Sequence, residues 1–232
     1  MAKKLSKDEL KSPDAFLTIG QRALDLIEQN LAAIICVLVV LILAGGAVIG
    51  YNSYQKHVEM KAAQMLYPSQ RDISQELAKD HKVSESTLKT FEAQLKANGG
   101  TAVGLASALE TASELLKSSQ AKQALDILNL VKYRPKKTDF YFGLLKMTKG
   151  LAYLDADQPD KALAEYAAVI QEDAQKAFHP EALLKSGLAS EKKNDFDKAK
   201  GFYERVSQEF SNTEQGHLAL QYMMFLTRKK GA

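Results

Sequence analysis

The chain has 232 residues, and its 31 basic and 28 acidic side chains give a formal net charge of +3 at pH 7. This balance is too even for the basic footprint of a nucleic-acid-binding protein. The single cysteine, Cys36, excludes an intramolecular disulfide framework, a thiolate metal site and a Cys-x-x-Cys redox pair.

Residues 1–30 are predicted to form a leader that contains an amphipathic helix. Ser12, Pro13 and Asp14 are typical of a helix start, because serine caps, proline fits the first turn and an acid favours the positive end of the helix dipole. Apolar residues then recur on one face of the expected helix, which favours a position at the membrane surface.

Residues 31–51, LAAIICVLVVLILAGGAVIGY, carry no charge over 21 positions. A helix of that length matches the roughly 30 Å hydrocarbon core of a bilayer. A buried core helix is one alternative, but such a helix is rarely apolar on every face. Cleavage as a signal peptide is the other, and it is opposed by the 30-residue leader with its five acidic residues, by the length of the apolar run and by the lack of a convincing small-x-small cleavage site. We therefore predict one transmembrane helix, in which Gly46 and Gly50 would allow another helix to approach closely.

Residues 52–100 are expected to form a helical stalk and linker. Helical spacing continues past the apolar run until Pro68, which is predicted to interrupt the helix. Residues 69–83 are polar and weakly periodic, so we expect a loop or a short helix there. A further helix is predicted over residues 84–97, with Gly99 in its stop signal.

Residues 101–232 show helical spacing throughout and contain an internal repeat. The segments that begin at Gly150 and Gly187 align with a shift of 37 residues, and a segment that begins at Ala112 aligns with a shift of 38. Small residues stand where paired helices should cross, at Gly150, Gly187, Ala124, Ala162 and Ala199. Larger side chains follow each alanine by four positions and would fill the space toward the next hairpin, at Leu128, Tyr166 and Tyr203.

This pattern predicts an all-α fold in which three helical hairpins stack as a solenoid and a last helix, residues 213–229, caps the end. Gly150, Tyr153, Ala162 and Tyr166 resemble the signature positions of the tetratricopeptide repeat. The resemblance implies a domain that binds other proteins. The third hairpin departs from the signature, since Ser190 stands at the place of Tyr153.

The first helix of each hairpin carries apolar residues on a second face, opposite the face that meets its partner helix. Either another part of this chain, such as residues 84–97 or the C-terminal cap, or a partner protein must cover that face. If a partner covers it, the residues that would bind the partner are Leu144, Met147, Leu151, Leu184 and Leu188.

The sequence offers no constellation that suggests catalysis. Its four histidines, His57, His81, His179 and His217, fall in different elements without the spacing of a metal site, so we expect solvated or capping roles. Phosphate-loop, dinucleotide-binding and nucleophile-elbow patterns are absent from the sequence. We predict a non-catalytic protein with no cofactor, no metal and no small-molecule substrate.

The order of leader, single anchor helix, stalk and tetratricopeptide-like domain resembles the bacterial YfgM-type family. Proteins of that family are inner-membrane proteins with a periplasmic repeat domain, and they associate with the SecYEG translocon and a membrane-anchored periplasmic chaperone. The resemblance implies a translocon accessory protein with a cytoplasmic N-terminus, an orientation that the flanking charges favour only narrowly. A scaffold for another envelope complex, such as division or cell-wall machinery, is the alternative, and an enzyme is a distant third.

Overall fold

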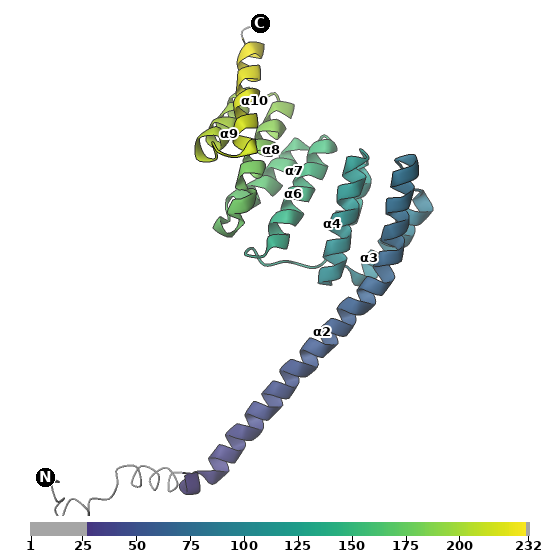
Figure 1. Cartoon of the computed structure of the whole chain (residues 1–232), viewed down its shortest axis with the longest axis vertical. Coiled ribbons are helices and arrows are strands. Elements are labelled where there is room, and N and C mark those ends of the chain that lie inside the picture. The colour runs from purple at the N-terminus through teal and green to yellow at the C-terminus, as the bar shows by residue number, and fades with distance from the viewer. Residues whose placement is uncertain (1–26, 231–232) are drawn as a thin grey trace, which may run out of the picture. The chain divides into compact units, whose positions relative to one another are not determined.

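The computed structural model describes residues 27–230, and no strand occurs among them. The predicted all-α fold class is confirmed (Figure 1). The amphipathic helix expected in the leader lies before residue 27 for most of its length, outside the described residues. The chain divides into two compact units between His57 and Val58, and each is described by itself.

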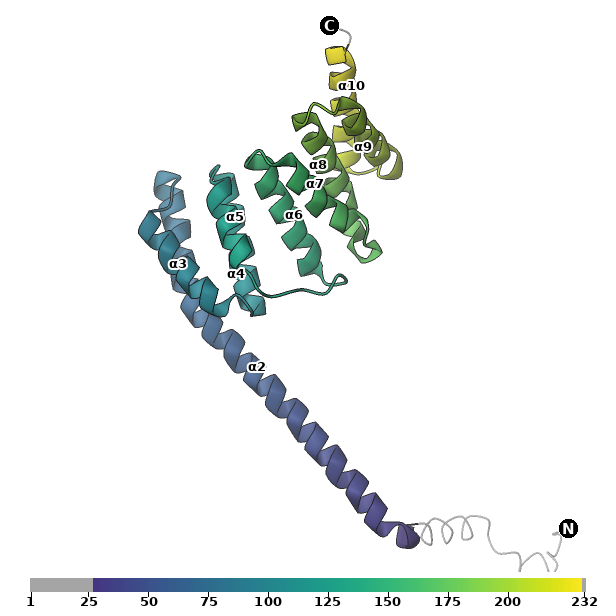
Figure 2. The same cartoon turned by 180° about the vertical axis from the view of Figure 1, so that it is seen from behind.

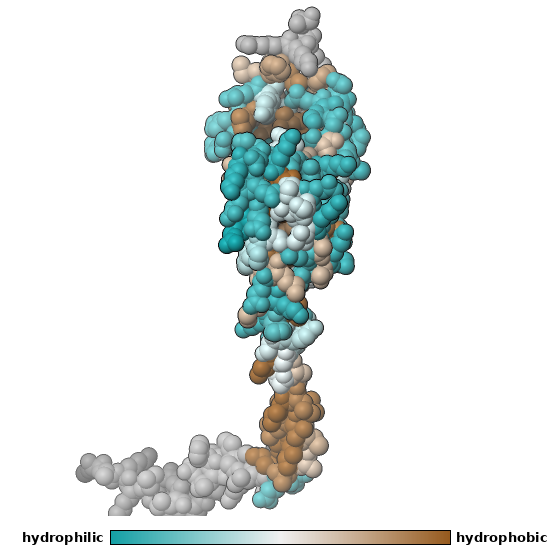
Figure 3. All heavy atoms as spheres, turned by 90° about the vertical axis from the view of Figure 1, so that its right-hand side faces the viewer, coloured by the Kyte–Doolittle hydropathy of each residue, from teal (hydrophilic) through white to brown (hydrophobic). Residues whose placement is uncertain are grey.

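In the first unit, the N-terminal part of helix α2 (Leu31–Asp80) exposes its apolar side chains on every face. Ile42 is 72% exposed and Leu43 is 67% exposed. Figure 3 shows the resulting hydrophobic band. Among the described residues, this is the one helix that is long and apolar enough to cross a membrane. Because none of the described residues covers its apolar side chains, it is a candidate membrane span rather than a core helix.

In the second unit, the C-terminal part of α2 pairs with helix α3 (Glu85–Asn98). The Ser69 hydroxyl donates to the Gln94 side chain at 2.8 Å, and Leu66 and Ile73 share one core with Phe91. The prediction that Pro68 interrupts the helix is wrong, because α2 continues through it to Asp80.

The physical reason is that the buried face of α2 is continuous on both sides of the proline. The buried residues keep helical spacing across it, at Ala62, Leu66, Ser69, Gln70, Ile73 and Leu77. Proline removes one backbone N–H donor and strains one turn, whereas packing of the whole face supports the helix on either side.

Two glutamates hold this hairpin in place, one through a contact with the next helix and one through contacts between its own two helices. Both carboxylate oxygens of Glu59 accept backbone N–H groups, from Ala102 and Val103, at 2.9 Å each, and so cap the first turn of the next helix. The Ser84 backbone N–H, together with the Thr87 hydroxyl, lowers the pKa of the Glu76 carboxyl. Residues 58–98, expected as stalk and linker, therefore form a packed hairpin at the start of the solenoid.

The three predicted hairpins and the capping helix follow and are confirmed. The hairpins are α4 (Ala102–Lys117) with α5 (Ala121–Leu130), α6 (Phe140–Asp155) with α7 (Pro159–Ile170), and α8 (His179–Lys192) with α9 (Phe196–Glu209). A short 3₁₀ helix, η1 (Asp173–Phe178), leads into α8, and α10 (Glu214–Lys230) packs against α9 through Ala219 and Leu226. Figures 1 and 2 show these hairpins side by side in chain order.

The turns inside the hairpins repeat as regularly as the helices. Each contains one non-glycine residue with positive φ: His81 at 53°, Ser119 at 59°, Asp157 at 57° and Asn194 at 60°. These positions are 38, 38 and 37 residues apart. The left-handed residue lets the chain end one helix and reverse into the next. The α2–α3 turn therefore belongs to the same repeat series as the other three.

Candidate functional site: an apolar groove on the solenoid

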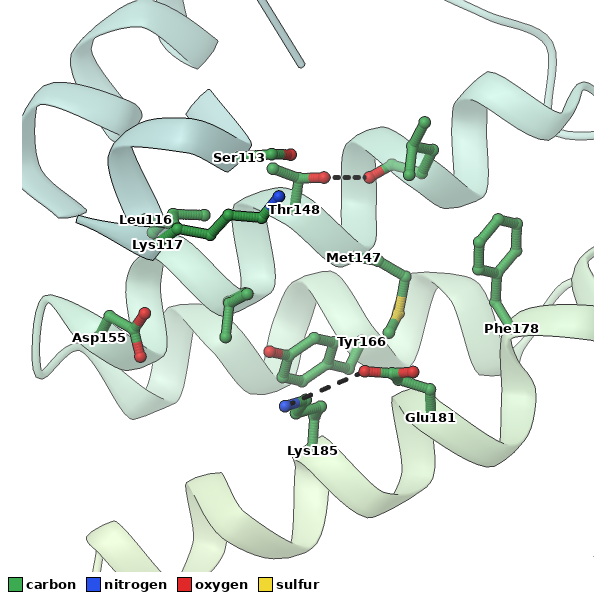
Figure 4. Close-up of a pocket in the computed structure, with 12 residues that line it drawn as sticks. Ser113, Leu116, Lys117, Met147, Thr148, Asp155, Tyr166, Phe178, Glu181 and Lys185 are labelled. Atoms are coloured by element: carbon green, nitrogen blue, oxygen red, sulfur yellow. Dashed lines mark hydrogen bonds and ion pairs between the residues drawn. The ribbon is translucent and has the colours of Figure 1, made fainter. Parts of the chain in front are cut away.

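A groove of about 460 Å³ lies along the first helices of three consecutive hairpins (Figure 4). Its apolar lining comes mainly from α4 and α6. The residues that line it are Ser113, Leu116, Lys117, Leu144, Met147, Thr148, Leu151, Asp155, Tyr166, Phe178, Glu181 and Lys185. Neither α3 nor α10, the two segments considered as an internal cover, contributes to this lining.

The structure brings three of the five predicted partner-binding residues together. Leu144, Met147 and Leu151 all line the groove and are half-buried. Leu184 is only 5% exposed and lies in the core cluster around Tyr203, and Leu188 packs against the cluster that contains Tyr166. Helix α8 presents a neighbouring face to the groove.

That face of α8 carries Glu181 and Lys185, which the sequence analysis did not select. They are four residues apart and therefore share one side of the helix. Their side chains are 4.0 Å apart and partly exposed, so the ion pair contributes little to stability. With Lys117 and Asp155, the groove carries two cationic and two anionic side chains, and its lining has no net charge.

Tyr166 is the large aromatic side chain at the floor of the groove, and a glycine fixes its position. A Cβ atom on Gly150 would lie 2.3 Å from a Tyr166 ring carbon, and one on Gly187 would lie 2.2 Å from a Tyr203 ring carbon. Each tyrosine thus packs against the glycine of its own hairpin, in addition to the contacts toward the next hairpin that the repeat pattern predicted. Only glycine leaves room for the ring at these helix crossings.

The two tyrosine hydroxyl groups have different surroundings. The Tyr203 hydroxyl donates a hydrogen bond to the Glu191 carboxylate. The Tyr166 hydroxyl is buried and has no hydrogen-bond partner. Counting back 37 residues from Glu191 gives Leu154, which offers no acceptor. Burial, with the nearby charges of Asp155 and Glu181, raises the pKa of Tyr166, so its hydroxyl stays neutral at physiological pH.

The other hydroxyl groups of the lining are satisfied within their own helices. Thr148 donates to the Leu144 carbonyl and Ser113 donates to the Leu109 carbonyl, each at 2.8 Å. The Tyr166 hydroxyl is therefore the one hydroxyl in this lining without a partner. Its position in the groove could not be read from the repeat signature, which gives the ring a packing role only.

The histidines lie in the capping or solvent-exposed positions expected of them. His179 is buried, and its Nε2 lies 3.1 Å from the carbonyl oxygens of Val169 and Glu172, so it caps the C-terminal end of α7. His57, His81 and His217 are exposed. Within residues 27–230, no group of three or more metal-ligating side chains gathers.

Gly46 and Gly50 lie in the exposed apolar part of α2. A Cβ atom on either glycine would meet nothing within 4 Å, so this face of the helix is open in the structure. None of the described residues makes the close approach that the two glycines would permit.

Comparison with known proteins supports the repeat assignment. The family model described as a tetratricopeptide repeat matches residues 181–213, which contain the loop between α8 and α9 and nearly all of both helices. No curated protein and no solved structure matches the chain significantly. Stacked hairpins, glycine–aromatic crossings and this match define a tetratricopeptide-like protein, a class of generally non-catalytic modules for protein–protein interaction.

Proposed function

We propose that this chain is a membrane-anchored adapter whose groove binds a segment of another polypeptide. The groove itself carries the proposal. Leu144, Met147 and Leu151 are half-buried side by side, and an incoming apolar side chain would complete their burial. Each Å² of apolar surface removed from water contributes about 25 cal/mol to the binding free energy, so the insertion of one or two apolar side chains of the partner would favour binding.

Photo-crosslinking tests the groove directly. A benzophenone amino acid in place of Met147 should capture the partner in native membranes, whereas the same residue in place of Lys200, exposed on α9, should not. Equal capture at both positions would show that the groove is not the binding surface.

For the particular role, we propose a translocon accessory protein that meets emerging chains or recruits a periplasmic chaperone. The architecture supports this proposal only through its resemblance to the YfgM-type family. Mass spectrometry of the Met147 crosslinks decides between the alternatives. Translocon subunits or periplasmic chaperones are the expected products; division or cell-wall proteins would favour the envelope scaffold instead.

For the topology, we propose that residues 31–51 span the bacterial inner membrane, that residues 1–30 lie in the cytoplasm, and that the repeat domain lies in the periplasm. The exposed apolar stretch of α2 supports the span. Protease added to intact spheroplasts should digest the chain beyond Tyr51. Protection in spheroplasts combined with digestion in inverted vesicles would show that the orientation is the opposite one.

Gly46 and Gly50 are the proposed contact between the anchor and a partner helix. Leucine at both positions would fill the open face and should abolish copurification of a membrane partner in mild detergent. Leucine at Ala33, in the same apolar run, is the control and should leave copurification unchanged.

A further inference from the structure

We propose that the groove takes its polypeptide in an extended conformation and that the Tyr166 hydroxyl forms a hydrogen bond with a backbone amide of that segment. This inference rests on the proposed function, because it names the chemistry of the segment that the groove would bind. It begins from the unpaired hydroxyl at the floor of the groove.

An unpaired hydroxyl in this position is unusual. Buried polar groups in proteins nearly always have a partner, because losing hydration without a replacement is unfavourable. The neighbouring repeat shows that the fold can supply one, since Glu191 accepts from Tyr203. In the hairpin of Tyr166, Leu154 stands in the corresponding place, and the hydroxyl is left for a group that comes from outside.

A ligand can reach the hydroxyl through a small movement of side chains. Figure 4 shows Tyr166 between α6 and the pair formed by Glu181 and Lys185 on α8. The ends of that pair are 4.0 Å apart, so the Lys185 side chain is only weakly held. The Lys185 side chain is partly exposed, and a change of its rotamer would open the floor of the groove without moving a helix.

The charges around the groove indicate a neutral ligand group. The lining carries two lysines and two acids, which gives no preference for a charged ligand. Near the hydroxyl itself, the carboxylates of Asp155 and Glu181 are the charges that raise the pKa of Tyr166, and they would repel an anionic acceptor. A backbone amide is neutral, both accepts and donates, and accompanies apolar side chains in every polypeptide.

The same hydrogen bond distinguishes an extended segment from a helix. In a helix, all carbonyl groups except those of the last turn are already bonded within the helix. In an extended segment, carbonyl groups are free to accept from Tyr166 while alternate side chains point to the apolar wall of Leu144, Met147 and Leu151.

The binding experiment uses the full chain in lipid nanodiscs and two fluorescent probes. One is reduced, carboxymethylated α-lactalbumin, which is permanently unfolded, and the other is an amphipathic peptide locked as a helix by lactam bridges. Tyr166→Phe should weaken binding of the unfolded probe about 3- to 10-fold, the value of one hydrogen bond, and leave the affinity for the helical peptide unchanged. Tyr203→Phe, the matched control, should change neither affinity.

A thermal measurement on the full chain in detergent micelles tests whether the Tyr166 hydroxyl has only a structural role. Tyr166→Phe removes an unpaired buried hydroxyl and should raise the melting temperature by about 2–4 °C, whereas Tyr203→Phe removes a satisfied hydrogen bond and should lower it by a similar amount. A lower melting temperature for Tyr166→Phe, or an unchanged affinity for the unfolded probe, would overturn the proposal.

Met147→Glu separates this inference from the proposed function. It places a charge on the apolar wall and should abolish binding of both probes. If Met147→Glu weakens binding and Tyr166→Phe does not, the groove binds polypeptide and the hydrogen bond is absent. If the unaltered chain binds neither probe, or Met147→Glu binds as well as the unaltered chain, the proposed function itself fails.

Discussion

The hairpins α6–α7 and α8–α9 have the same packing at their helix crossing and different polar surroundings just beyond it. In both, a glycine on the first helix faces the ring of a tyrosine on the second, Gly150 with Tyr166 and Gly187 with Tyr203. In α8–α9 the hydroxyl is bonded to Glu191; in α6–α7 it has no partner and lies at the floor of a groove.

The solenoid requires a fixed packing at the helix crossing, whereas the hydrogen-bond partner of the tyrosine hydroxyl can vary. A ring against a glycine holds two helices at a fixed distance, and both of these hairpins have this contact. The residue at the position of Glu191 does not set that distance, and it is Leu154 at the corresponding place in α6–α7. A binding site can therefore be built at the hydroxyl without changing the stack.

The largest effect that tests this comparison should come from the shared glycines. Gly150→Ala and Gly187→Ala each place a methyl group within 2.3 Å of a buried ring. We expect each to lower the free energy of unfolding by about 1–3 kcal/mol, because the buried ring or one of the two helices must shift to make room for the methyl group. Thermal and urea unfolding of the full chain in detergent, followed by circular dichroism, would measure both.

Gly201→Ala is the matched control for these substitutions. Gly201 is also a helical glycine, but a Cβ atom there meets nothing within 4 Å. Alanine should stabilise the chain by up to about 1 kcal/mol through helix propensity alone. If Gly150→Ala or Gly187→Ala behaves like Gly201→Ala, the two hairpins do not share the crossing described here.

A smaller effect should come from making the α8–α9 hairpin resemble the α6–α7 hairpin. Glu191→Leu leaves the Tyr203 hydroxyl buried without a partner and should cost about 1 kcal/mol. In a Tyr203→Phe background the same change should cost almost nothing, because no hydroxyl remains to be satisfied. Equal losses in the two backgrounds, measured as a double-mutant cycle, would mean that Glu191 acts through packing and not through the hydrogen bond.

The fold could be predicted from sequence wherever the small and aromatic positions recur at a constant shift. The hairpin of α2 and α3 was not predicted, although α2 follows the same series. Its buried residues Leu66, Gln70, Ile73 and Leu77 each stand 38 positions before a buried residue of α4. The partner helix obscured this register. The turn from His81 to α3 is two residues longer than the other three turns, so a shift of 38 falls on the exposed Ser86 and Thr90. The buried residues of α3 are Leu88, Phe91 and Leu95.

The groove could be predicted only in part, for a geometric reason. Spacing places Leu144, Met147 and Leu151 on one face of α6, and the structure agrees. It does not determine how far α8 is rotated, and this rotation buries Leu184 and turns Lys185 toward the groove. The unpaired hydroxyl could not be predicted from the sequence either, since a missing hydrogen-bond partner is recognised only when every neighbour of the side chain is known.

The smallest effect that sharpens the comparison is the response to alkaline pH. Burial raises the pKa of both tyrosines, and in Tyr203 the hydrogen bond to Glu191 adds to the effect. In the unfolded chain a tyrosine ionises near pH 10. Below that pH both states keep the proton and stability is unaffected; above it only the unfolded state loses the proton, so stability falls as pH rises.

For one tyrosine that stays protonated in the folded state, the loss at pH 10.5 is about 0.8 kcal/mol, and it approaches about 1.4 kcal/mol for each further pH unit. The unfolding free energy of the full chain should fall between pH 8 and pH 10.5. In Tyr166→Phe, and likewise in Tyr203→Phe, this fall should be smaller than in the unaltered chain by about 0.8 kcal/mol. The double variant should show both reductions together, because the two rings lie in separate core clusters. Other groups that titrate in this range are common to all four proteins and cancel in the comparison. A smaller reduction for Tyr166→Phe than for Tyr203→Phe would mean that the Tyr166 hydroxyl reaches water through the groove and ionises in the folded chain, in conflict with its burial beneath the lining.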